Sequence, residues 1–84
     1  MDLDKTMFFK VEKNKEIDSK KILKDVYEAL VEKGYNPINQ IVGYLITNDP
    51  GYISSYKDAR KKMLSLDRAT VLAIILKDCL QCDI

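Results

Sequence analysis

From residue 19 onward, the apolar residues of this chain recur at steps of three and four, and this period restricts the fold more than any other feature. Such spacing is typical of one face of an α-helix, and Asp18 or Ser19 can cap its start. Gly34 can end the helix in a left-handed conformation. The pattern predicts a helix over residues 19–33, whose inward face carries Ile22, Leu23, Val26, Tyr27, Leu30 and Val31.

A second helix is predicted from Pro37 to about residue 47 or 48. Asn36 can cap it, and Pro37 suits the first helical position because no backbone N–H donor is needed there. Gly43 lies in the middle of this helix, where it costs about 1 kcal/mol relative to Ala. A close helix crossing would explain that cost. We expect the inner face to carry Ile38, Ile41, Val42, Leu45 and Ile46.

Two further helices are predicted after the turn at residues 48–51, where Pro and Gly follow each other. A short helical turn is expected near residues 52–56. A third helix then covers residues 56–65, with Ala59, Met63 and Leu66 facing inward. The last helix, over residues 68–81, is capped by Asp67 and is apolar around most of its circumference.

A terminal helix that is apolar nearly all round should be covered by another subunit in a protein this small. We therefore predict an all-α fold, a small bundle of four to five short helices that forms a homodimer. Its dimer interface is predicted at Leu72, Ile75 and Leu76.

The first eighteen residues differ from the rest, because they are charged and contain few aliphatic side chains. Such a segment buries too little apolar surface to offset its ordering entropy unless it docks on the body. We predict a flexible regulatory arm over residues 1–18 and a helical domain over residues 19–84. The Met7-Phe8-Phe9 run is the exception, and it either anchors the arm to the body or is a short recognition element.

Composition narrows the function. The chain has 84 residues, enough for one domain, and its 14 Lys and Arg nearly balance its 13 Asp and Glu. That balance argues against a nucleic-acid partner, and the absence of His removes the commonest general base. We predict no catalytic residues, no cofactor and no metal site. No apolar stretch is long enough to insert into a membrane, and no secretory signal is apparent, so the protein is expected to be cytoplasmic.

The two cysteines, Cys79 and Cys82, are spaced like a CxxC pair. A redox motif would need a strand before it, whereas an apolar helical run precedes this pair. We interpret them as incidental cysteines at a helix end, with redox chemistry or intermolecular metal binding as the alternative.

Positive charge is concentrated between residues 55 and 68, which carry a net charge of +3. Arg60 and Lys61 fall on the outer face of the third predicted helix, and Arg68 lies in the first turn of the next. These three side chains are near enough to converge on one phosphate or carboxylate. The alternative is an ordinary solvated helix face.

The central run Gly34-Tyr35-Asn36-Pro37-Ile38-Asn39-Gln40-Ile41-Val42-Gly43-Tyr44-Leu45 resembles the IreB family, also called ReoM. Two later runs, Asp49-Pro50-Gly51-Tyr52-Ile53 and Asp58-Ala59-Arg60, extend the resemblance, as does Lys5-Thr6-Met7-Phe8-Phe9. Members of this family are small cytoplasmic regulators of low-GC Gram-positive bacteria, and they are all-helical homodimers.

The resemblance implies that Thr6 is the phosphoacceptor of a membrane-bound Ser/Thr kinase with extracellular PASTA repeats, with a cognate phosphatase. It also implies control of cell-envelope synthesis and antibiotic tolerance, in part through Clp-dependent degradation of an early peptidoglycan enzyme. Adaptor or Clp-type protease machinery is then a partner. The chain departs from the family pattern where proline and basic residues are usual, at Ser54, Ser55, Leu64 and Ser65. Partner affinity is therefore less safely inferred than fold.

Several polar residues of the central run have two interpretations. Asn36, Asn39 and Gln40 form either a surface that binds a partner, or one helix cap followed by amides on the exposed side of a helix start. Tyr44 and Tyr52 are assigned with them to a partner or dimer surface. An enzyme built on Tyr35, Tyr44, Asn36 and Asp49 lacks a nucleophile-base pair. A helix-turn-helix nucleic-acid module is the alternative function, but residues 37–47 contain no Lys or Arg to contact phosphate.

Overall fold

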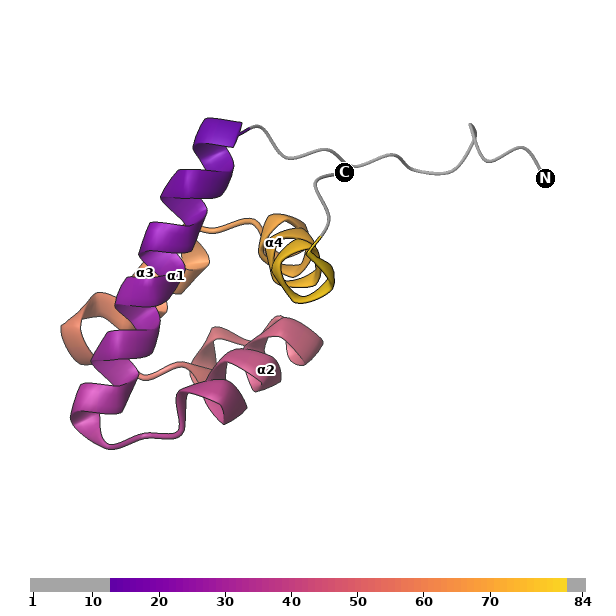
Figure 1. Ribbon diagram of the computed structural model, residues 1–84. Helices are drawn as coiled ribbons and strands as arrows, with labels where there is room; N and C mark the ends of the chain where they lie inside the picture. Colours follow the sequence, from indigo (N-terminus) through magenta and orange to yellow (C-terminus); the bar gives the residue numbers. More distant parts are fainter. Residues whose placement is uncertain (1–12, 82–84) are drawn as a thin grey trace.

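The computed structural model describes residues 13–81, and this part of the chain is helical without strands. It contains α1 (Lys13–Lys33), α2 (Pro37–Thr47), α3 (Ala59–Leu64) and α4 (Arg68–Leu80). Two short 3₁₀ turns, η2 (Pro50–Tyr52) and η3 (Tyr56–Asp58), connect α2 to α3. Figure 1 shows α2 and α4 on the same side of the long helix α1, with α3 packed behind it. The predicted all-α fold is confirmed.

The ends of α1 and α2 follow the predicted signals. Gly34 has φ +89°, and the N–H groups of Gly34 and Tyr35 donate to Val31 and Leu30, both at 3.0 Å, as in a Schellman motif. The Asn36 side chain then accepts from the N–H of Asn39 at 3.1 Å and caps α2. Local sequence therefore fixes the connection between the first two helices.

The start of α1 differs from the prediction. The helix begins at Lys13 rather than Ser19, so residues 13–18 are not part of an irregular arm. Glu16 stabilises this extra length, because it pairs with Lys20 one turn later and with Lys77 of α4. Ionic contact with a distant helix replaces the apolar burial that we expected the segment to need. Residues 1–12, with Met7-Phe8-Phe9, lie outside the described residues.

The core lies where α1 packs against α3 and the start of α4. The side chains that are buried almost completely are Val26, Leu30, Ile53, Met63 and Val71. Ala59, Met63 and Leu66 face inward as predicted. The η3 turn reaches α3 through Lys57 and Asp58, both with positive φ (49° and 61°).

The inner face of α2 was predicted correctly only for Ile41, which is buried, and Leu45, which packs against the core. Ile41 and Tyr44 are its buried residues, whereas Ile38, Val42 and Ile46 are 60%, 44% and 77% exposed. A helix with apolar residues on most sides does not reveal by period alone which side packs inward. The same ambiguity applies to α1, whose residues Tyr27 and Val31 are about half exposed.

Gly43 makes a close approach, but not with another helix. A Cβ at this position would overlap the ring of Tyr52, which belongs to η2. The predicted helix crossing is therefore wrong, and an aromatic ring occupies the space instead. A larger residue here would have to displace the Tyr52 ring, because α2 and the turn that follows it pack together at this point.

Candidate functional site

Four features of the described residues bear on function: the basic segment, the polar residues of α2, an apolar groove and an ion-pair cluster. Thr6, the predicted phosphoacceptor, lies outside the described residues. So does Cys82, whereas Cys79 is exposed near the end of α4. Within residues 13–81, no group of three or more His, Cys, Asp or Glu side chains is arranged to hold a metal ion. No helix among them is long and apolar enough to cross a membrane.

The two arginines of the predicted anion site both donate to backbone carbonyls. Arg60 Nε lies 2.8 Å from the carbonyl oxygen of Ile53, and Arg68 Nη1 lies 2.7 Å from that of Leu45. The Leu45 carbonyl is in the last turn of α2, where helix carbonyls lack partners within the helix. Arg68 thus also places a positive charge at the negative end of the helix dipole. Lys61 is exposed and has no ion-pair partner among residues 13–81.

Acidic residues of α1 offset much of the positive charge predicted for this segment. Lys57 Nζ lies 2.8 Å from Glu32 Oε1, and the Tyr56 hydroxyl donates to Glu32 Oε2 at 2.7 Å. The hydrogen bond from Lys57 has the largest effect and that from Tyr56 the next, and together they hold the pKa of Glu32 below its ordinary value. Lys62 lines the same shallow pocket as Asp25 and Glu28 of α1. Sequence reasoning missed this pairing because the charges that meet are far apart along the chain.

The polar residues of α2 divide into structural and exposed groups. Gln40 Oε1 accepts from the N–H of Ser54 at 2.9 Å and so holds the loop after η2 against α2. Tyr44 is only 3% exposed, so its assignment to a surface is wrong: the ring is part of the core. Asn36 acts as the helix cap, as one interpretation predicted. Asn39 and Tyr52 remain exposed, with the Tyr52 ring also covering Gly43.

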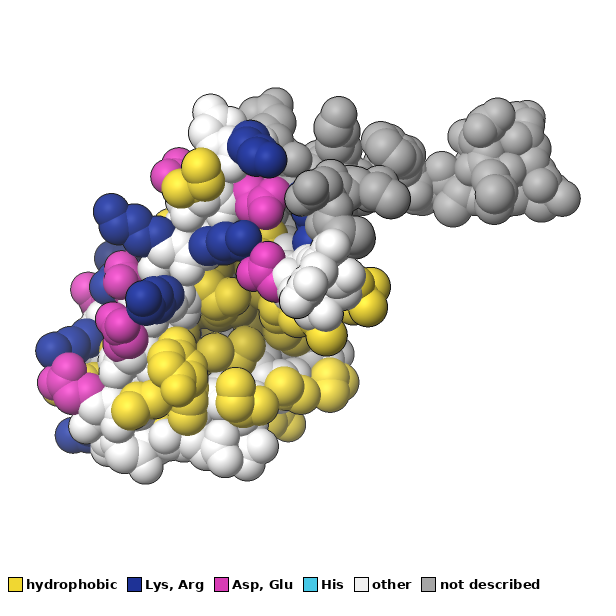
Figure 2. All heavy atoms as spheres, viewed as in Figure 1, with side chains coloured by type: hydrophobic (Ala, Val, Ile, Leu, Met, Phe, Trp, Pro, Cys, Tyr) yellow, Lys and Arg dark blue, Asp and Glu magenta, His cyan; other side chains and the backbone are white. Residues whose placement is uncertain are grey.

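An apolar groove of about 550 Å³ lies between α1, α2 and α4. Leu23 and Tyr27 come from α1, Ile38 and Val42 from α2, and Ile75 from α4. Figure 2 shows the hydrophobic side chains gathered over these helices in one continuous patch. Of the three predicted interface residues, Ile75 lines this groove, whereas Leu72 and Leu76 are not among its lining residues. All three are exposed, and the exposed fractions of Leu72, Ile75 and Leu76 are 45%, 40% and 57%. The exposed apolar surface is therefore wider than α4 alone.

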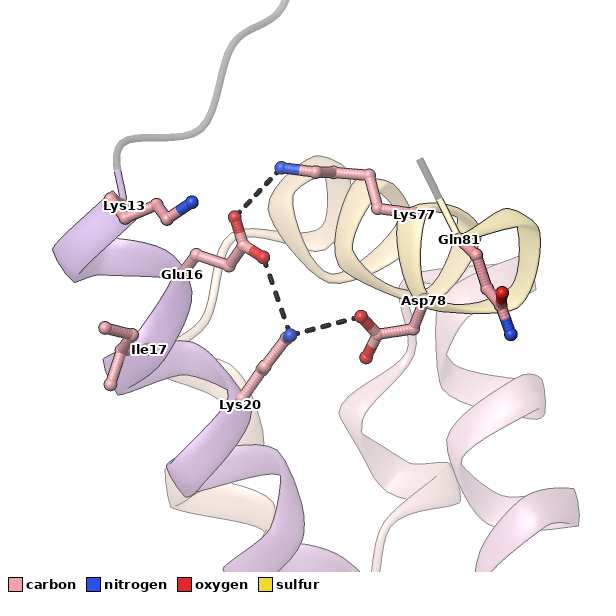
Figure 3. Close-up of a pocket in the computed structure, with 7 residues that line it drawn as sticks. All are labelled: Lys13, Glu16, Ile17, Lys20, Lys77, Asp78 and Gln81. Carbon is pink, nitrogen blue, oxygen red and sulfur yellow. Dashed lines mark hydrogen bonds and ion pairs between the residues drawn. The ribbon is translucent and has the colours of Figure 1, made fainter. Parts of the chain in front are cut away.

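An ion-pair cluster joins the first turns of α1 to the last turns of α4 (Figure 3). Lys77 Nζ lies 2.9 Å from Glu16 Oε1, and Lys20 Nζ lies 3.5 Å from Glu16 Oε2 and 3.1 Å from Asp78 Oδ1. The hydrogen bond from Lys77 is the main cause that lowers the pKa of Glu16. The hydrogen bond to Asp78 likewise raises the pKa of Lys20. Sequence reasoning missed the cluster, since it assigned Glu16 to the arm.

Comparison with known proteins identifies relatives over nearly the whole chain. A family model described as IreB regulatory phosphoprotein matches residues 4–81, a range that includes Thr6 and every described helix. A protein named UPF0297 from Ruminiclostridium cellulolyticum is 51% identical over 77 residues. The aligned region covers 92% of this chain and 88% of that relative.

Proposed function

The chain belongs to the IreB family of regulatory phosphoproteins, and from this premise we propose that it is a non-enzymatic regulator switched by phosphorylation of Thr6. A Ser/Thr kinase and its cognate phosphatase set the switch in the cytoplasm. The pathway it regulates is cell-envelope synthesis, with antibiotic tolerance as a consequence. The observation that carries the proposal is the family match, which extends through residues 4–81 and therefore includes Thr6.

The environments of four other hydroxyl side chains favour Thr6 as the phosphoacceptor. Thr47 donates to the Gly43 carbonyl at 2.7 Å, and Ser65 donates to the Lys62 carbonyl at 2.6 Å. Thr70 is held by Asp67, and Ser54 accepts from the N–H of Tyr56. A kinase would have to break these contacts before it could transfer phosphate, because each hydroxyl is part of a helix end or turn.

The experiment uses the purified kinase with the whole protein and its Thr6→Ala variant. We expect the variant to lose nearly all phosphate incorporation, and mass spectrometry to place the phosphate of the parent protein at position 6. Ser55 is the informative control position, because it is exposed and has no hydrogen bond to its hydroxyl among residues 13–81. Phosphate found mainly at Ser55 or Thr47 would contradict the assignment.

The exposed apolar surface supports a homodimer as the working form of the regulator. Monomers of this size seldom expose a continuous patch that covers three helices. Molecular mass in solution tests this, with Leu76→Lys as the disruptive variant and Leu64→Lys as its control. Leu64 is 50% exposed on α3, close to the 57% of Leu76, but it is not one of the predicted interface residues of α4. We expect only Leu76→Lys to yield a monomer, and a monomeric parent protein would refute the dimer.

Downstream, we propose that the protein acts through adaptor or Clp-type protease machinery on an early enzyme of peptidoglycan synthesis. Asn39 is the best probe of a partner surface on α2, because it is exposed and its side chain has no hydrogen bond within residues 13–81. Asn39→Ala should therefore weaken a pull-down of the partner without unfolding the protein. Gln40→Ala shows the effect of a structural change for comparison, since it also removes the hydrogen bond that Gln40 accepts from the N–H of Ser54.

The helix-turn-helix alternative gains no support from α2. This helix contains no Lys or Arg, and its exposed side carries Ile38, Val42 and Ile46. A recognition helix needs donors for phosphate oxygens. A gel shift at low salt, with no retardation of DNA, is the expected result.

A further inference from the structure

We propose that the pocket between the start of α1 and the end of α4 is an intramolecular docking site for the phosphate carried by Thr6. The proposal rests on phosphorylation of Thr6 as the switch, and it names where the modified arm binds. The pocket is lined by three lysines, Lys13, Lys20 and Lys77, and by two carboxylates, Glu16 and Asp78. Its occupant is the phosphothreonine of the same chain.

The pocket is formed by side chains that already hold each other in position. Figure 3 shows Glu16, Lys20, Lys77 and Asp78 meeting across the gap between the two helices. The side chains of Glu16 and Lys77 are only 13% and 20% exposed, so the positions of these charges are more fixed than those of ordinary surface charges. The volume is about 470 Å³, against about 30 Å³ for a water molecule in the liquid. A phosphate group and several waters therefore fit.

The charges suit a phosphate. Three lysines against two carboxylates leave the pocket with a formal charge of +1. Each ammonium group has three donors, and Lys13 has no ion-pair partner among residues 13–81. Lys77 donates one hydrogen bond there, to Glu16. Phosphate supplies about −1.5 to −2 charges and three acceptor oxygens, so it can use the remaining donors and compete with the carboxylates for the others.

The covalent length of the arm favours this pocket over the other basic residues. Thr6 precedes Lys13 by seven residues, which span at most about 25 Å when extended. Glu16 and Lys20 lie only about 5 to 10 Å along the axis of α1 from Lys13. Lys57 and Lys62 lie beside residues 25–32, about 18 to 28 Å along the same axis. The arm reaches the first pocket with slack, and a tethered group has an effective concentration in the millimolar range.

Docking of the phosphate would change the contacts between α4 and α1. The phosphate would draw Lys20 and Lys77 away from Asp78 and Glu16, and these contacts hold the last turns of α4 to α1. Ile75 and Leu76, which are exposed, directly precede Lys77 and Asp78 on α4. The phosphorylation state of the arm would thereby affect the position of the surface proposed as the dimer interface.

The test uses the full-length chain with phosphothreonine installed at position 6 by semisynthesis, so that it does not depend on any kinase. Phosphorus NMR follows the titration of the phosphate in the folded protein and in urea. We expect the second pKa of the phosphate to be lower by about one unit in the folded chain, because nearby ammonium groups favour the dianion. Backbone amides of residues 13–20 and 77–81 should shift, and amides of η3 should not.

Three variants distinguish this site from general electrostatic attraction. Lys77→Gln should remove most of the lowering of the phosphate pKa, whereas Lys62→Gln, an equal change of charge outside the pocket, should leave it unchanged. Asp78→Asn should make the phosphate pKa fall further on folding, because a carboxylate that competes for the lysines is lost. A purely structural role for the ion-pair cluster predicts no such opposition between Lys77→Gln and Asp78→Asn. Circular dichroism confirms that each variant is folded.

The same measurements can overturn the proposal. An unchanged phosphate pKa on folding would show that the arm does not dock, and equal effects of Lys62→Gln and Lys77→Gln would place the phosphate elsewhere. A shift that grows with protein concentration would assign the phosphate to a second copy. None of these outcomes bears on whether a kinase modifies Thr6, and failure of the kinase assay would leave the docking measurement valid.

Discussion

Gly43→Ala is the substitution whose effect best separates local from tertiary contributions in this fold. In an exposed helix interior, Gly→Ala stabilises by about 1 kcal/mol, because glycine loses more backbone entropy on folding. In α2 the added Cβ would overlap the Tyr52 ring, and overpacking of this kind costs about 1–3 kcal/mol. We therefore expect the sign to reverse, with a net destabilisation of about 1 kcal/mol.

The matched background for this prediction is Tyr52→Ala, which removes the ring that the Cβ would meet. There Gly43→Ala should stabilise by about 1 kcal/mol, so the double-mutant cycle should give a coupling energy of about 2 kcal/mol. Urea unfolding followed by circular dichroism measures each free energy, at one fixed protein concentration because a dimer couples stability to concentration. Stabilisation by Gly43→Ala in both backgrounds would refute the role assigned to the ring.

Three further predictions concern stability. Leu30→Ala, which truncates a side chain with 0% exposure, should lower the free energy of unfolding by about 2–5 kcal/mol in the same urea assay. Asn36→Ala should lower the free energy of unfolding by about 0.5–2 kcal/mol. In hydrogen exchange, amide protection should be lost only near the start of α2. The pKa of Glu16 is lowered in the folded protein; its contribution to stability is therefore complete above its unfolded pKa and is lost as pH falls through the folded value. Glu16→Gln should make the melting temperature fall less steeply on acidification, and an unchanged slope would contradict the ion pair with Lys77.

Signals confined to a few neighbouring residues were sufficient for the helix ends. Asn36 and Pro37 start α2, Gly34 ends α1, and Asp67 caps α4 by accepting from the N–H of Thr70. Each of these interactions spans at most six residues, so the sequence pattern alone contains it. The inward positions Ala59 and Met63 were also predictable, because they lie four residues apart on α3 and are separated by three basic residues.

Features that depend on distant residues were not predictable in the same way. The first turns of α1 are stabilised by Lys77, which is 61 residues away from Glu16. The exchange of Tyr44 for Ile38 on the buried side of α2 depends on which neighbour packs there, and hydrophobic period does not specify the neighbour. Of the candidate site, the exposed positions of Lys61 and Leu76 agree with expectation, while the carbonyl contacts of Arg60 and Arg68 had no signal in the sequence.

The contact between Arg68 and the Leu45 carbonyl has a consequence for affinity measurements. An anion that takes the whole guanidinium must first release that carbonyl, which then loses its partner at the end of α2. The observed affinity is then the difference between two bonds rather than the strength of one. Such an anion would also loosen the end of α2 from the start of α4, so that binding at this residue and mobility between the two helices rise together.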